Sequence, residues 1–346
     1  MKTQMEACVL CPRKCKANRS QGEKGICGQS ANIRVARADL HMWEEPSISG
    51  SKGSGTVFFS GCSLHCVFCQ NHNIANGEAG KEITIERLAE IFLELQEKGA
   101  NNINLVTAGQ FVPQVVEALK IAKANGLQLP VVYNTSSYEN VETLKLLDGY
   151  VVIYLPDLKY VDKELSKQYS HAEDYFQQAK EAIKEMVRQT GEMEFVVERS
   201  IEEKYSAEGP GKVDKIEIER SPEQKYEIRR FGIQEYQLRS EQGEDLVMTK
   251  GVIVRHLILP GCVEDSRKVL EYLLGEYGNQ IFISIMNQYT PLPHVAAYPE
   301  LNRKVTREEY EEVVNYAIEL GIENGFVQEG EAAAESFIPE FDGRGV

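Results

Sequence analysis

Cysteines are the residues of this 346-residue chain whose type and spacing most clearly predict chemistry. Seven of the eight fall within the first 70 residues, in two clusters, and Cys262 stands alone. In a chain without the features of a secreted protein, such clusters favour metal or redox chemistry over disulfides. We interpret Cys262, which follows Pro260-Gly261, as a small buried residue and not as a ligand.

The second cluster, Cys62, Cys66 and Cys69, lies on one short loop after a predicted buried strand. Three and two intervening residues place three thiolates on a tight loop, which suits a cubane iron–sulfur cluster with one iron left open for a non-protein ligand. Structural zinc would need a fourth protein ligand, which His65 or His72 could supply. The spacing favours iron–sulfur but leaves zinc open.

The first cluster, Cys8, Cys11, Cys15 and Cys27, occupies a segment with few apolar residues. Burial cannot offset the chain entropy of such a segment, so we predict that a second metal site stabilises it. Zinc and an iron–sulfur cluster fit four thiolates equally well, and a metal-free reduced knot is the weaker alternative. The basic residues among these cysteines predict a solvated loop; they are Arg13, Lys14, Lys16 and Arg19.

The elements that must position the second cluster alternate between strand and helix from residue 55 onward. Six strands are predicted: Gly55–Ser60, Ile103–Val106, Pro130–Tyr133, Tyr150–Leu155, Val252–Leu259 and Ile281–Met286. Amphipathic helices separate them, and a capping box, Thr306 and Glu309, opens the last long helix. Six such units imply a parallel sheet, and six are fewer than the eight that close a barrel. We therefore predict an α/β fold, a partial (β/α)6 TIM-like barrel.

Residues 192–250 interrupt this rhythm with 15 acidic and 10 basic residues in 59 positions. Ile216 and Ile218, then Tyr226 and Ile228, alternate with charged residues and predict a solvent-facing β-meander or hairpin. A disordered charged loop is the alternative. The predicted organisation is a Cys-rich N-terminal extension at 1–54, the partial barrel at 55–191 and 251–346, and this charged insert.

Composition narrows the classes of function. A formal net charge of −15 argues against nucleic acid as the main partner, because phosphate binding needs a dense basic face. No apolar run approaches the ~20 residues that cross a bilayer. The N-terminus has no apolar signal-peptide core, and we therefore expect a cytoplasmic protein without a membrane partner.

Polar residues follow every predicted strand, at the end where parallel barrels gather their functional side chains. They are the cysteine loop, Thr107–Gln110, Asn134–Ser137, Asp157–Lys159, Arg255–His256 and Asn287–Tyr289. Because neighbours on a strand point to opposite faces, at most one of Arg255 and His256 faces this mouth. Plainer interpretations stay open: Asp157 and Lys159 as a strand-end ion pair, and Asn134 as a turn cap.

The cysteine loop, with Phe68 before its last cysteine, resembles the CxxxCxxC motif of radical S-adenosylmethionine (SAM) enzymes. The resemblance extends to PflX-type proteins, homologues of pyruvate formate-lyase activating enzyme, and covers nearly everything except the charged insert. It rests on the stretches EEPSISG, GSGTVFFSGCSLHCVFCQN, LPDLKY, VRHLILPG, YPELNR and SFIPEFDGRGV.

This resemblance implies a [4Fe–4S] cluster on Cys62, Cys66 and Cys69 whose open iron is chelated by SAM. Reduction by a one-electron donor such as flavodoxin or ferredoxin would yield methionine and a 5′-deoxyadenosyl radical, which abstracts hydrogen from a substrate. In an activating enzyme that substrate is a protein glycine of a glycyl radical enzyme. A radical SAM catalyst acting on a small molecule or peptide is the first alternative. A non-catalytic iron–sulfur or zinc protein is the second.

The resemblance also assigns places around the cofactor. Thr107 and Gly109 belong to the turn that receives the SAM amino group. The other expected residues are Asn134 near the ribose, Phe68 near the adenine, Arg255 as a further cofactor-binding residue, and Asp157 and Lys159 as catalytic residues near the methionine end or the substrate. The family's TPTH is replaced here by Thr107–Gln110 (TAGQ), and its glycine by Ser137. Both departures touch the pocket, so the resemblance does not identify the substrate.

Overall fold

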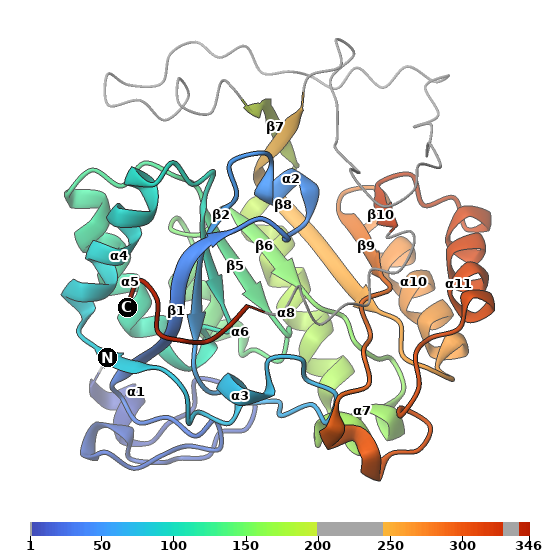
Figure 1. Cartoon of the computed structure of the whole chain (residues 1–346), viewed down its shortest axis with the longest axis horizontal. Helices are drawn as coiled ribbons and strands as arrows, with labels where there is room; N and C mark the ends of the chain where they lie inside the picture. Colours follow the sequence, from blue (N-terminus) through green and yellow to red (C-terminus); the bar gives the residue numbers. More distant parts are fainter. Residues whose placement is uncertain (1, 199–244, 328–338) are drawn as a thin grey trace.

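The computed structural model describes residues 2–198, 245–327 and 339–346. In these ranges a ten-stranded sheet has the order β10-β9-β8-β6-β5-β4-β2-β1-β3, with β7 paired to β8 (Figure 1). The strands are β1 Ile33–His41, β2 Ser54–Phe59, β3 Lys81–Ile83, β4 Ile103–Val106, β5 Val131–Thr135, β6 Ile153–Pro156, β7 Glu194–Val197, β8 Leu246–Leu257, β9 Phe282–Met286 and β10 Gly325–Val327.

Helices alternate with the parallel strands. The α-helices are α1 Lys2–Glu6, α2 Pro46–Ser49, α3 His72–Ala75, α4 Ile85–Glu97, α5 Val112–Ala124, α6 Val141–Leu144, α7 Lys163–Ser170, α8 Tyr175–Thr190, α10 Val263–Tyr277 and α11 Arg307–Glu319. The predicted capping box of α11 is present, since Thr306 and Glu309 bond each other's backbone N–H groups. None of the described helices combines the length and apolar character that crossing a membrane requires.

The predicted α/β fold class is confirmed. β2, β4, β5, β6, β8 and β9 are the six predicted strands, and each pairs in parallel with the next. Among the described residues the sheet runs from β10 at one edge to β3 at the other and does not close into a barrel. The apolar face of α4, with Leu88, Phe92 and Leu95 fully buried, contributes to the main hydrophobic core.

Four strands of this sheet, β1, β3, β7 and β10, were not predicted. β10 adds a seventh parallel strand, and its three residues are too few to show a periodic pattern. β1 pairs antiparallel with β2, and β3 pairs antiparallel with β1. The register of β1 shifts between Val35 and Arg37, which breaks the alternation by which a strand is recognised in a sequence.

The ends of the charged insert belong to the sheet. β7 pairs antiparallel with the first half of β8, which therefore begins at Leu246, six residues before the predicted Val252. The pairing of Val197 with Leu246 and a backbone hydrogen bond of 2.9 Å from Glu198 to Asp245 hold the two ends together. The predicted meander around residues 216–228 lies outside the described residues.

Candidate active site

The cysteine loop leaves β2 through a turn that requires glycine. Gly61 has φ +86°, and a Cβ at this position would overlap the carbonyl oxygen of Cys27. His65 also adopts a left-handed backbone conformation, with φ 54°. These two turns fold residues 61–69 back on themselves, so the three predicted ligands lie on one compact loop.

Hydrogen-bond donors point at two sulfurs of this loop. The backbone N–H of Leu64 lies 3.4 Å from Cys62 Sγ, and the Ser170 hydroxyl donates to Cys66 Sγ at 3.0 Å. Burial raises the pKa of Cys66 to about 11 and that of Cys69 to about 12. Buried thiols of this kind become thiolates when a metal binds them, and N–H and O–H donors then stabilise the negative sulfur. The loop therefore fits an iron–sulfur cluster in its donor set.

The histidines proposed as an alternative zinc ligand do not join this set. His65 Nε2 lies 2.9 Å from the carbonyl oxygen of Ile26, in the N-terminal segment. The His72 ring lies 4.4 Å from the His294 ring. Across the described ranges no three His, Cys, Asp or Glu side chains are already gathered closely enough to hold one metal ion. Metal binding must therefore draw the thiols inward from these positions.

Phe68 forms an apolar wall next to the cysteines. Its ring is buried and lies 6.3 Å from the rings of both Tyr160 and Tyr289. Tyr160 in turn bonds Ser170, the residue that donates to Cys66. The structure thus places Phe68 among tyrosines, while its contact with adenine stays a prediction.

The turn after β4 is tied to the cysteine loop. Gln110 Nε2 donates to the carbonyl oxygens of Ser60 (2.8 Å), Gly61 (3.0 Å) and Thr107 (2.9 Å). Thr107 has φ 58°, an uncommon conformation for a β-branched residue. A Cβ on Gly109 would lie 2.7 Å from Glu139 Oε1, so a side chain at this position would require the Glu139 carboxylate to move.

The structure brings together four of the predicted residues from the ends of β5, β6 and β8. Arg255 donates to Asp157 Oδ1 at 3.0 Å and to Asn134 Oδ1 at 2.6 Å. Lys159 Nζ donates to the other carboxylate oxygen of Asp157 at 2.7 Å. Lys159 also lies close enough to Cys66 to lower the pKa of that thiol against the larger effect of burial. The network therefore reaches the cysteine loop.

His256 faces the opposite side of β8. Its ring nitrogens lie 2.7 Å from the Leu158 carbonyl oxygen and 2.9 Å from the Ser266 hydroxyl, and burial lowers its pKa to about 4. Arg255 is therefore the member of this pair that faces the polar network.

Sequence reasoning missed two acidic residues of this network. Glu44 lies 3.4 Å from Arg255 Nη1 and accepts from Asn134 Nδ2 at 3.3 Å, while Glu45 is buried nearby. Both follow β1, which runs antiparallel to β2 and delivers them at the N-terminal end of the parallel strands. The acidic pair before Pro46 is visible in the sequence, but no local pattern indicates that these two side chains lie beside Arg255 and Asn134.

Glu45→Gln is expected to change how stability depends on pH. Burial, partly opposed by Arg255, raises the pKa of Glu45 from 4.5 to about 7. A carboxyl with a raised folded-state pKa stabilises the fold fully below pH 4.5 and loses that contribution as the pH rises through 7. The free energy of unfolding of the glutamine variant should therefore exceed that of the wild type by about 3 kcal/mol at pH 8, and the two should be equal near pH 4.5.

Urea denaturation at pH 4.5, 6 and 8 measures this difference. Glu97→Gln, at an exposed position, is the matched control and should leave the free energy of unfolding unchanged at all three pH values. Equal stability of wild type and the Glu45 variant at pH 8 would contradict the buried carboxyl.

The N-terminal segment packs against the ends of β4 and β5 and the cysteine loop. Asn140 and Thr143 donate to the carbonyl oxygens of Val9 and Leu10, at 2.6 and 2.7 Å. Arg13 donates to the carbonyl oxygens of Ser63 (2.8 Å) and Ser170 (3.2 Å). The predicted solvated loop is therefore wrong for Arg13, which holds the active-site loop, and for the buried Arg19; Lys14 and Lys16 are exposed as expected.

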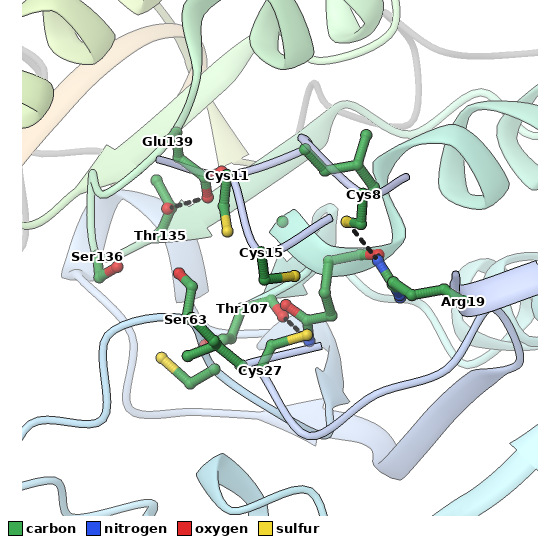
Figure 2. Close-up of a pocket in the computed structure, with 15 residues that line it drawn as sticks. Cys8, Cys11, Cys15, Arg19, Cys27, Ser63, Thr107, Thr135, Ser136 and Glu139 are labelled. Atoms are coloured by element: carbon green, nitrogen blue, oxygen red, sulfur yellow. Dashed lines mark hydrogen bonds between the residues drawn. The ribbon is translucent and has the colours of Figure 1, made fainter. Parts of the chain in front are cut away.

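The four N-terminal cysteines surround one small cavity of about 20 Å³ (Figure 2). Cys62, Thr107 and Gly109 form part of the same wall. Glu139 also lines it; burial raises its pKa to about 7, and its Oε2 has no hydrogen-bond partner. The two cysteine clusters, 35 residues apart in the chain, are therefore neighbours in space.

Comparison with known proteins agrees with this geometry. Residues 56–192, which span β2 to α8, match the model of the radical SAM superfamily. The matched segment contains Cys62, Cys66 and Cys69 and the network residues Asn134, Asp157 and Lys159.

Two relatives show how far the similarity reaches. An uncharacterized protein of Methanocaldococcus jannaschii is 24% identical over 318 residues, covering 90% of this chain and 74% of the relative. Pyruvate formate-lyase-activating enzyme of Clostridium pasteurianum is 29% identical over 135 residues, 36% of this chain and 54% of that enzyme.

Among solved structures, SuiB of Streptococcus suis bound to its precursor peptide SuiA matches with a TM-score of 0.44 and 13% identity, over 78% of this chain. The chain spans about half the length of the activating enzyme and of SuiB, 54% and 47% respectively.

Proposed function

We propose that this protein is a radical SAM enzyme that cleaves S-adenosylmethionine reductively and abstracts hydrogen from a substrate. The observation that carries this proposal is the loop of Cys62, Cys66 and Cys69, three half-buried cysteines beside the network of Lys159, Asp157 and Arg255. When bound there, a [4Fe–4S] cluster with SAM on its open iron supplies a 5′-deoxyadenosyl radical.

The chain's own residues orient and enclose that chemistry. Ser170 and the Leu64 N–H support the sulfurs, and Arg13 fixes the loop that carries them. Lys159 and Arg255 offer cationic N–H groups beside Asp157, where the carboxylate of SAM or a polar substrate would be oriented. Phe68 and its neighbouring tyrosines exclude water from the same side.

The substrate we favour is a backbone glycine of a glycyl radical enzyme. The partial similarity to pyruvate formate-lyase-activating enzyme supports this choice. A small molecule or peptide is the alternative, because Thr107–Gln110 and Ser137 depart from the family pattern next to the pocket. The electron donor on this proposal is a flavodoxin or ferredoxin, and the location is the cytoplasm.

The charged insert is proposed to recognise the substrate. It leaves the sheet at β7 and returns at β8, outside the regular strand–helix series, where insertions often carry binding functions. We expect that replacing residues 199–244 by a short Gly/Ser linker preserves iron content and SAM cleavage without substrate. The reason is that the backbone hydrogen bond from Glu198 to Asp245 holds the two ends of the replaced segment together. Activity on the true substrate should fall.

Two measurements decide this prediction. Iron content and 5′-deoxyadenosine release are compared between the linker variant and the wild type, with and without an anaerobically captured partner protein. A variant that also lacks β7 is the control and should lose stability, since Phe195 packs 5.6 Å from Phe282. Insoluble protein from the linker variant would show that the insert is part of the core.

The class of substrate is tested with the captured partner. A glycyl radical detected by electron paramagnetic resonance on that partner, dependent on SAM and on Cys66, supports the activating function. SAM cleavage that is stimulated only by small molecules or peptides favours the alternative.

A further inference from the structure

Arg19, in the N-terminal segment, is a buried positive charge that the proposed function does not explain. Its side chain is 1% exposed. Its guanidinium donates to neutral acceptors, the carbonyl oxygens of Ser30 (2.7 Å) and Gln110 (2.7 Å), and one face lies over the Phe111 ring at 5.6 Å. Within the described ranges no carboxylate lies at ion-pair distance from it. A buried guanidinium without a counter-charge is costly, so the site calls for an anion.

A cysteine supplies a further contact. Arg19 Nη1 points at Cys8 Sγ, 3.7 Å away (Figure 2). A protonated thiol is a weak, neutral acceptor, whereas a metal-bound thiolate carries negative charge. Cys11, Cys15 and Cys27 line the same cavity, and the Cβ position of Gly25 lies 3.2 and 3.5 Å from the sulfurs of Cys15 and Cys27.

We infer that Cys8, Cys11, Cys15 and Cys27 form a second metal centre, a tetrathiolate site whose negative charge is balanced by the buried Arg19. Four thiols lose four protons on binding, so one Zn²⁺ or one [4Fe–4S]²⁺ cluster leaves the site with a net charge of −2. The guanidinium offsets part of this charge. The cavity is compact, about 20 Å³, and the thiols must rotate inward to meet the metal.

The position of this centre makes it a support for the active site. Cys62 forms part of the cavity wall, Arg13 holds the carbonyl oxygen of Ser63, and His65 reaches the carbonyl oxygen of Ile26. Folding of the N-terminal segment around a metal therefore fixes both sides of the loop that carries Cys62. This coupling rests on the proposed function, whereas the metal site itself does not.

The first experiment isolates the new site from the catalytic cluster. Protein in which Cys62, Cys66 and Cys69 are all alanine is reconstituted anaerobically with iron and sulfide, or purified with zinc present, and analysed for metals. About four irons per chain identify a cluster that could also relay an electron, and about one zinc identifies a structural site. Either result supports the tetrathiolate centre, and absence of both metals overturns it. This outcome is independent of whether the wild type cleaves SAM.

The second experiment tests the counter-charge in that same triple-alanine protein. Arg19→Gln removes the buried charge, and Lys16→Gln removes an exposed charge one residue from Cys15. Challenge with a chelator should strip metal from the Arg19 variant at least tenfold faster than from the parent, while the Lys16 variant should match the parent. Equal rates for all three proteins would show that Arg19 does not balance a metal centre.

The support of the active site is tested in the otherwise wild-type chain. Cys15→Ser, which removes a single ligand, should lower cluster occupancy at Cys62, Cys66 and Cys69, read from the SAM-dependent change in the cluster's paramagnetic resonance spectrum. Full cluster occupancy in this variant would show that the N-terminal metal centre does not support the loop that carries Cys62. A wild type that shows no such spectrum would instead count against the proposed function.

Discussion

Replacing Cys66 by alanine is expected to abolish 5′-deoxyadenosine formation. Cys66 is the middle one of the three predicted ligands, is half-buried, and accepts a hydrogen bond from Ser170. The cysteines within four residues of Cys66 are Cys62 and Cys69, which are predicted ligands themselves, so no spare neighbouring thiol can replace it without moving the loop. The measurement is anaerobic reconstitution with iron and sulfide, followed by chromatography of the products formed with dithionite and SAM.

The matched control is Cys262→Ala. Cys262 is half-buried and its thiol contacts only the carbonyl oxygen of Pro260 among the hydrogen bonds of the described residues, at 3.7 Å. This variant should keep its activity. A wild type that binds no iron, or a Cys66 variant that still forms 5′-deoxyadenosine, would refute the assignment of the cysteine loop.

Arg255→Met is expected to destabilise the fold by about 3–5 kcal/mol at neutral pH. The Arg255 side chain is 14% exposed and makes ion pairs with Asp157 at 2.8 Å and Glu44 at 3.4 Å. Removing it leaves two buried carboxylates with less compensation. Burial raises the pKa of Asp157, but Arg255 and Lys159 outweigh that effect, so its pKa lies below 3.8.

Stability that depends on a lowered folded-state pKa is present above 3.8 and is lost as the pH falls through the folded value. The gap between wild type and Arg255→Met should therefore be widest near neutrality and shrink below pH 4. Urea denaturation across this range measures it. Arg307→Met is the control, because the Arg307–Glu311 pair is exposed and should contribute little to stability. Similar losses for both variants would contradict a buried network.

The strands and helices of the partial barrel could be predicted because the sequence patterns that indicate them are local. Each parallel strand is a short apolar run, and helices such as α4 repeat apolar residues on one face between clear start and stop signals. Strands lacking those signals were missed: β1 has an irregular register, and β10 has only three residues. The extended start of β8 depends on its pairing with β7, a contact that spacing cannot reveal.

The chemistry of the cysteine loop was predicted from the sequence alone, because three candidate ligands within eight residues need no tertiary information to be recognised as a set. The sequence also indicated the four cysteines of the N-terminal segment. Only the tertiary structure showed that these two clusters line one cavity and that Arg19 is buried beside Cys8. Likewise, only the antiparallel path of β1 brings Glu44 to Arg255, 211 residues further along the chain. The physical reason is that charge balance in a protein interior depends on burial and on partners distant in sequence, neither of which a local pattern records.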